Sequence, residues 1–172
     1  MNPKFRNHHL GFTLVEMMVS MAIMATLAGI MTISYGAFRE RAEKVACMGK
    51  LKTLHSAFAT HVEDVGYWPQ IPEDVGDAFE YYNAIIKAVS PYGGDRYAWM
   101  CPTEARIGLV SISRDDFMGS YAPTMYDTVP GRPYEWGSQP WLIERVDNHG
   151  TGQLFVLPDS SIHSVGDLMK GR

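Results

Sequence analysis

The chain has 172 residues, of which 46% are hydrophobic, and a formal net charge of −4. This length suits one ordinary domain with an appendage. The sequence contains neither a basic block nor basic residues interleaved with aromatic ones, so nucleic acid is not an expected partner.

A long apolar run dominates the first forty residues. From Met17 to Phe38 there are 22 residues without a charged side chain, and a helix needs about 20 to span a bilayer. A short leader with Lys4 and Arg6 precedes the run, and one acid, Glu16, lies just before it. The pattern predicts a membrane helix near the N-terminus.

Two ordinary interpretations of this segment stay open. A secretory signal is cleaved after its apolar part, and Thr26-Leu27-Ala28 offers such a site, although the run continues past it. A single-pass anchor is the other interpretation. Its orientation is not set by charge, because Lys and Arg occur on both sides of the span.

The stretch Gly11-Phe12-Thr13-Leu14-Val15-Glu16 resembles the processing site of type IV prepilins and type II secretion pseudopilins. The resemblance joins the short basic leader, the Gly–Phe pair, the glutamate at the fifth mature position and the apolar helix that follows. It implies that prepilin peptidase cuts between Gly11 and Phe12, methylates the new N-terminus of Phe12 and leaves the helix attached.

Glu16 has two explanations. An acid near the start of a helix favours the helix dipole and lies close to the lipid headgroups, which explains why it is tolerated. The resemblance implies more, namely that Glu16 pairs with the free amine of Phe12 on a neighbouring subunit and so guides assembly.

The helix is expected to continue far beyond the membrane. No proline occurs between Phe12 and Val65, and Gly66 follows. The second half carries an apolar stripe at spacings of three and four, typical of a helix packed on a soluble domain. The stripe consists of Val45, Met48, Leu51, Leu54 (or His55), Phe58, Val62 and Val65.

The rest of the chain predicts a short helix and a small antiparallel sheet. The helix is expected over 77–90, and residues 126–140 are expected to form a loop. Strand patterns cover Tyr97–Cys101, Ile107–Ile112, Ser120–Met125, Trp141–Val146, Gly152–Leu157 and Ser161–Val165. The last two runs flank Pro158-Asp159-Ser160 and predict a hairpin.

The predicted fold class is therefore α+β, with the pilin-like layout that the resemblance implies. The expected divisions are a cleaved leader over 1–11, a transmembrane and filament-core helix over 12–38, its amphipathic continuation over 39–65, and an exported globular domain over 66–172.

The two cysteines, Cys47 and Cys101, are too few for a disulfide scaffold. An oxidising compartment would favour their pairing, and a bridge closing about 55 residues is worth roughly 4 kcal/mol in the chain-entropy model. Two unrelated thiols are the alternative.

A second resemblance lies near the C-terminus. His149 and Asp159 have the spacing of the H-x9-D-G ending of a pilin-like subgroup, and Cys101-Pro102 is similar to its Cys-Pro pair. Ser160 stands where that subgroup has glycine. The ordinary interpretation is that these residues shape the end of the hairpin.

No motif for a catalytic nucleophile or metal site is evident in the sequence. His55 and His61 are six residues apart, so on a helix they face different directions. Major pseudopilins can hold calcium in a C-terminal loop, and Asp127, Asp147 and Asp159 could supply oxygen ligands, although their spacing matches no named site. No other cofactor and no enzymatic activity are expected.

Taken together, the resemblance implies a structural subunit of a type II secretion or type IV pilus-like filament. Its expected partners are copies of itself, other pilin-like subunits, prepilin peptidase, an inner-membrane assembly platform and membrane lipid. It is expected to cross the bacterial inner membrane once, with its C-terminal domain in the periplasm or outside. The alternative is a monomeric single-pass membrane protein whose exported domain binds a ligand or partner.

Overall fold

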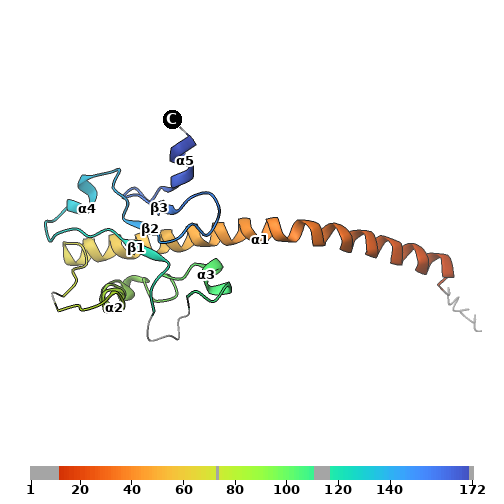
Figure 1. Ribbon diagram of the computed structural model, residues 1–172, viewed down its shortest axis with the longest axis horizontal. Coiled ribbons are helices and arrows are strands. Elements are labelled where there is room, and N and C mark those ends of the chain that lie inside the picture. The colour runs from red at the N-terminus through yellow and green to blue at the C-terminus, as the bar shows by residue number, and fades with distance from the viewer. Residues whose placement is uncertain (1–11, 73, 111–116, 171–172) are drawn as a thin grey trace, which may run out of the picture. The chain divides into compact units, whose positions relative to one another are not determined.

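The computed structural model describes residues 12–72, 74–110 and 117–170. The chain divides into two units between Arg39 and Glu40, here called the N-terminal unit and the globular unit and described separately (Figure 1). The elements are α1 (Leu14–Val65), α2 (Ala78–Val89), the short 3-10 helix η1 (Ser90–Tyr92), α3 (Pro102–Arg106), β1 (Tyr121–Pro123), α4 (Arg132–Glu135), β2 (Leu142–Glu144), β3 (Leu154–Val156), β4 (Ile162–Ser164) and α5 (Val165–Lys170). The predicted α+β class is confirmed.

The part of α1 in the globular unit buries one face of the helix. The core positions on this face recur at helical spacing, as an amphipathic helix requires: Cys47, Leu51, Leu54, Phe58 and Val62. The prediction of a core stripe is confirmed in its centre and wrong at both ends, because Val45 is 68% exposed and Val65 is 40% exposed. Cys47 begins the buried stripe instead.

α1 ends at Val65, and the next residue, Gly66, has a φ of +90°, in the left-handed region. The Gly66 N–H donates to the carbonyl of Val62 at 2.9 Å, which closes the last turn in the way glycine favours at helix ends. The chain then returns to the core, where Trp68 is completely buried. The Trp68 ring stacks on Phe58 at 4.6 Å and meets Trp141 edge-on at 5.1 Å.

The four strands form one antiparallel sheet in the order β1-β2-β3-β4. Its buried residues include Tyr121, Leu142, Leu154 and Val156, and the second half of α1 runs along the sheet (Figure 1). His55 of α1 stacks on Trp141 with the ring centroids 4.6 Å apart. The helix therefore supplies one side of the core and the sheet the other.

The predicted helix over 77–90 is confirmed as α2. Asp77 begins it, because its carboxylate accepts hydrogen bonds from the backbone N–H groups of Phe79 and Glu80, both at 2.9 Å. Such a cap satisfies amide donors that the helix itself leaves unpaired.

Two of the six predicted strands are wrong in the described part of the chain. Residues 97–99 form turns, because the Ala98 N–H donates both to the backbone carbonyl and to the carboxylate of Asp95. Residues 107–108 also form a turn, residue 109 is a bend, and residues 111–112 lie outside the described residues. The apolar side chain of Trp99 fills the core from a turn rather than from a strand.

Three short helices were not predicted. α3 begins at Pro102 and α4 has Pro133 at its second position, where a missing N–H costs nothing; the loop expected over 126–140 is therefore wrong at α4. The last predicted strand stops at Ser164, whose hydroxyl accepts from the Asp167 N–H at 3.1 Å and starts α5.

The predicted hairpin is confirmed as β3 and β4. Ser160 in its turn has φ of +65°, the left-handed conformation that completes a three-residue hairpin loop and favours glycine there. The turn thus has the backbone geometry for glycine although the chain supplies serine.

Replacing Ser160 by glycine is expected to stabilise the protein by about 0.5–1 kcal/mol, since relief of the left-handed strain exceeds the added entropy of the unfolded chain. Urea unfolding of the full chain in detergent measures the difference. Ser160→Ala removes the same hydroxyl without freeing the backbone, so it should give no gain; equal stabilisation by alanine would contradict the explanation.

Candidate functional site

The start of α1 is closed by a reciprocal pair of hydrogen bonds. The Thr13 backbone N–H and hydroxyl each donate to Oε2 of Glu16 at 2.8 Å, and the Glu16 N–H donates to the Thr13 hydroxyl at 3.2 Å. This is a capping box, in which a threonine and a glutamate three residues later satisfy each other's amide donors. Glu16 therefore has a role within its own helix.

Behind this cap the surface of α1 is apolar on all sides. The stretch Leu14–Met31 is long and apolar enough to cross a membrane, and its length is about 27 Å at 1.5 Å per residue. Its large side chains are exposed, for example Leu14 at 75% and Met31 at 74%. An uncovered surface of this size marks an interaction with lipid or protein.

The hydroxyl groups within this stretch bond to the helix itself. Ser20 donates to the carbonyl of Glu16 at 2.7 Å, and Thr26 donates to the carbonyl of Ile23 at 2.8 Å. In hydrocarbon every polar group needs an internal partner, so these two residues do not oppose burial in a membrane or in a filament.

The predicted processing site straddles the edge of the described residues. Phe12 is described and 79% exposed, whereas Gly11 lies outside the described residues. Cleavage between them therefore remains a prediction.

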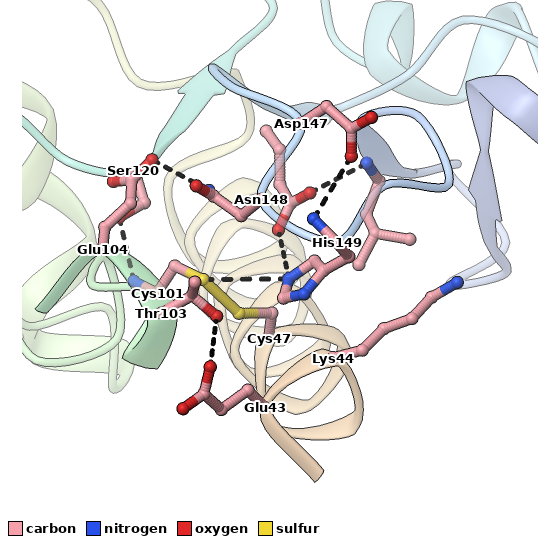
Figure 2. Close-up of polar contacts among 12 residues, drawn as sticks. Glu43, Lys44, Cys47, Cys101, Thr103, Glu104, Ser120, Asp147, Asn148 and His149 are labelled. Carbon is pink, nitrogen blue, oxygen red and sulfur yellow. Dashed lines mark hydrogen bonds and ion pairs between the residues drawn. A yellow bond between two sulfur atoms is a disulfide. The ribbon is translucent and has the colours of Figure 1, made fainter. Parts of the chain in front are cut away.

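A second candidate site lies in the globular unit, around the two cysteines. Cys47 of α1 and Cys101, which immediately precedes α3, form a disulfide with their Cα atoms 5.4 Å apart. Figure 2 shows His149 beside this bridge, with its Nε2 3.9 Å from the Cys101 sulfur. The same Nε2 is 3.4 Å from Oε1 of Glu144, and both side chains are almost completely buried.

The loop between β2 and β3 holds His149 in place through Asp147. Burial acts to raise the pKa of the Asp147 carboxyl, but backbone N–H groups, chiefly of Gly152 and His149, outweigh it and lower that pKa. The far end of the loop is tied to α1, because the Lys44 ammonium donates to the Thr151 hydroxyl at 2.9 Å.

The segment around Cys101 is likewise fixed. The Cys101 N–H donates to the Ser120 hydroxyl at 2.9 Å. Two groups of α3 contact Glu43 of α1: the Thr103 hydroxyl at 3.0 Å and the Arg106 guanidinium at 2.8 and 3.1 Å. A pocket of about 260 Å³ adjoins this contact and has His149 in its wall.

The three aspartates considered for calcium do not come together. Asp127 accepts from the Val129 N–H, Asp147 holds its own loop, and Asp159 accepts from the Ser161 N–H. Each carboxylate thus shapes a local turn. Among the described residues, the group that could hold a metal ion is instead Cys47, Cys101, Glu144 and His149.

The residues of the H-x9-D spacing have separate roles. His149 lies against the disulfide. Asp159 lies in the hairpin turn next to Pro158, whose carbonyl is 3.0 Å from Nε2 of His55. Burial lowers the pKa of His55, which favours the neutral ring that stacks on Trp141.

Sequence reasoning singled out His149 and the cysteines but missed Glu144. An isolated glutamate at the end of a strand looks like a solvated residue, and nothing in its spacing indicates complete burial. Its environment depends on the packing of β2 against β3, where its Oε2 accepts from the Leu154 N–H at 3.0 Å.

Comparison with known proteins agrees with the geometry of the N-terminus. The family described as "Prokaryotic N-terminal methylation motif" matches residues 6–32. A curated relative, the type IV major pilin protein PilA of Myxococcus xanthus (strain DK1622), is 28% identical over 130 residues, which is 74% of this chain and 59% of the relative. The chain therefore carries a prepilin-type N-terminal motif and is similar to a type IV pilin. Pilin-family proteins are structural subunits and not enzymes.

The chain spans less than two thirds of the length of the relative that it matches. No solved structure matches it significantly. Its fold nevertheless has the expected pilin-like arrangement, an apolar N-terminal helix followed by helices and a small antiparallel sheet.

Proposed function

We propose that this pilin-like protein is a subunit of a type IV pilus-like or type II secretion filament. The observation that carries the proposal is the exposed apolar surface of Leu14–Met31 directly behind the matched methylation motif. An apolar helix of this kind can lie in lipid before assembly and pack on its copies afterwards. Its work is mechanical, because adding subunits at the membrane extends or pushes a fibre.

Processing would generate the assembling form. Prepilin peptidase removes residues 1–11 and methylates Phe12, while the protein crosses the inner membrane once with its globular unit on the exported side. An assembly platform in that membrane then adds the subunit to copies of itself or to other pilin-like subunits in a periplasmic or surface fibre. The relative's name, a major pilin, supports a filament role rather than a solitary anchor.

Glu16 would serve in both states of the protein. In the single chain its carboxylate accepts two hydrogen bonds from Thr13, which reduces the cost of placing it at the membrane edge. In the filament its charge would pair with the amine of Phe12 on a neighbour. An unpaired charge in a low dielectric is strongly penalised, so the pair would favour one axial offset between subunits.

The processing step predicts a defined mass. The protein extracted from membranes of its native host should have lost residues 1–11 and gained one methyl group on Phe12, because the peptidase carries out both steps. Intact-mass spectrometry with N-terminal fragmentation measures both changes. A mature chain that retains Met1, or one cut after Ala28, would contradict the proposal.

The charge of Glu16 can be separated from its capping role. Glu16→Gln keeps a side-chain acceptor for the Thr13 amide, as the capping box allows, but removes the charge. It should be processed normally yet give markedly fewer filaments, and Glu16→Val should give fewer still because the cap is also lost. The yield of sheared, sedimentable filaments is the measurement.

Glu40→Gln is the matched control, since it removes an exposed acid from the same helix beyond the apolar stretch. It should leave filament yield unchanged. Normal assembly of Glu16→Gln would exclude the intersubunit charge pair while leaving the processing prediction intact.

A further inference from the structure

The disulfide of the globular unit lies next to two further side chains that can bind metal ions, a carboxylate and an imidazole. The sulfur atoms of Cys47 and Cys101, a carboxylate oxygen of Glu144 and a ring nitrogen of His149 all lie within 4.8 Å of one another. They come from four separate segments: α1, the residue before α3, the end of β2 and the β2–β3 loop. The fold therefore gathers two sulfurs, one imidazole and one carboxylate at a single buried point.

Glu144 is the least explained member of this group. Its side chain is 0% exposed, and Oε1 has no hydrogen-bond partner among the described residues. Oε1 faces Nε2 of His149 at 3.4 Å, whereas Oε2 is held by the Leu154 N–H. A buried carboxylate oxygen without a hydrogen-bond donor raises the free energy of the folded protein. A cation next to Oε1 would reduce this cost.

No described lysine or arginine supplies a positive charge next to Oε1 of Glu144. In the described ranges the ionisable residues with buried side chains include Glu104, Glu144, His61 and His149, and every lysine or arginine is at least partly exposed. Glu104 has its own partner, the Asn148 amide at 2.9 Å. Within the cluster only His149 can carry positive charge, and a neutral disulfide adds none.

We propose that Cys47, Cys101, Glu144 and His149 form a second state of this site, a tetrahedral Zn²⁺ site available when the two sulfurs are reduced. Thiolate, imidazole and carboxylate are the ligands that Zn²⁺ binds in proteins, at about 2.0–2.3 Å. The Leu154 N–H donates to Oε2 of Glu144 and so orients the carboxylate, as hydrogen-bond donors behind a metal ligand do.

The disulfide and the Zn²⁺ site exclude each other, because both use the same two sulfur atoms. Conversion of the disulfide to the Zn²⁺ site takes two steps, reduction and metal binding. A phosphine reductant cleaves the S–S bond and takes the oxygen of one water molecule to become a phosphine oxide, while each sulfur receives one hydrogen. Zn²⁺ then displaces the two thiol protons and binds both thiolates. In the oxidised protein, each sulfur is occupied by its bond to the other and only two ligands remain.

Access to the site comes through His149. The pocket of about 260 Å³ has His149, Thr103 and Asn148 in its wall and opens near the Glu43–Arg106 ion pair. An ion entering this pocket meets the imidazole first. The consequence is structural: the metal would join α1 to the segment before α3 when the disulfide cannot, so the helix stays fastened under reducing conditions.

The test uses the full chain in detergent micelles, with Co²⁺ as a spectroscopic probe and a phosphine as reductant under argon. The reduced protein should bind one Co²⁺ per chain with thiolate charge-transfer and tetrahedral visible bands, and one equivalent of Zn²⁺ should abolish them. The oxidised protein should show neither. Near-ultraviolet circular dichroism reports whether each sample keeps its aromatic core.

Two substitutions test the other ligands. Glu144→Gln and His149→Asn should each weaken metal binding at least about tenfold, and the Co²⁺ spectrum should change with them. Glu104→Gln is the matched control, because Glu104 is equally buried but belongs to the Asn148 contact; it should retain the wild-type bands.

The proposal is overturned if the folded, reduced protein binds no Co²⁺ through sulfur, or if Glu144→Gln and His149→Asn bind it as tightly as wild type. Reduced protein that loses its near-ultraviolet signal and does not recover it with Zn²⁺ would also overturn it, since the metal must replace the bridge. None of these outcomes bears on filament assembly.

Discussion

Everything in the globular unit depends on the burial of one face of α1 between Cys47 and Val62. The sheet is small, with four strands of three residues each, and strands this short do not form an independent core. α1 supplies the missing surface: Leu51, Leu54 and Phe58 are completely buried. The part of α1 that we propose for assembly therefore precedes residue 40, and the part that is covered by the globular unit follows it.

Polar contacts fasten the helix where the apolar stripe begins. The Cys47–Cys101 bridge, the Glu43–Arg106 ion pair and the Lys44–Thr151 hydrogen bond all lie within about two helical turns of the unit boundary. If the proposed filament pulls or pushes on the N-terminal helix, these contacts are the first that join the helix to the rest of the globular unit. A covalent bond there would resist such force better than apolar contacts alone, and the proposed metal site would do the same when the bridge is reduced.

The sequence predicted most strongly what depends on local pattern. The helix from Leu14 to Val65, the helix α2 and the β3–β4 hairpin follow from periodicity and from turn residues, both of which are visible in short windows. Residues 97–99 look like a strand because they include the apolar Trp99, which packs in the core. The hydrogen bonds to Asp95 fold their backbone into a turn instead. The short helices α3, α4 and α5 could not be predicted for a related reason. A single proline or serine starts each of them, and no periodic pattern can develop over four to six residues.

The candidate sites also differ in how far the sequence could predict them. The processing motif is contiguous, so sequence alone could identify it, and the Thr13–Glu16 capping box could be inferred from its three-residue spacing. The Cys–His–Glu cluster joins residues nearly one hundred positions apart, and the burial of Glu144 arises only when β2 pairs with β3. No local pattern carries that information.

The central claim is that the apolar helix is the assembly element, and a helical reconstruction by cryo-electron microscopy of filaments sheared from cells tests it most directly. The account predicts filaments built of this chain, starting at Phe12, with residues 12–38 packed on their copies in the core and the globular units outside. Filaments held together through the globular units, or a chain that stays monomeric in membranes where its processing is complete, would contradict it.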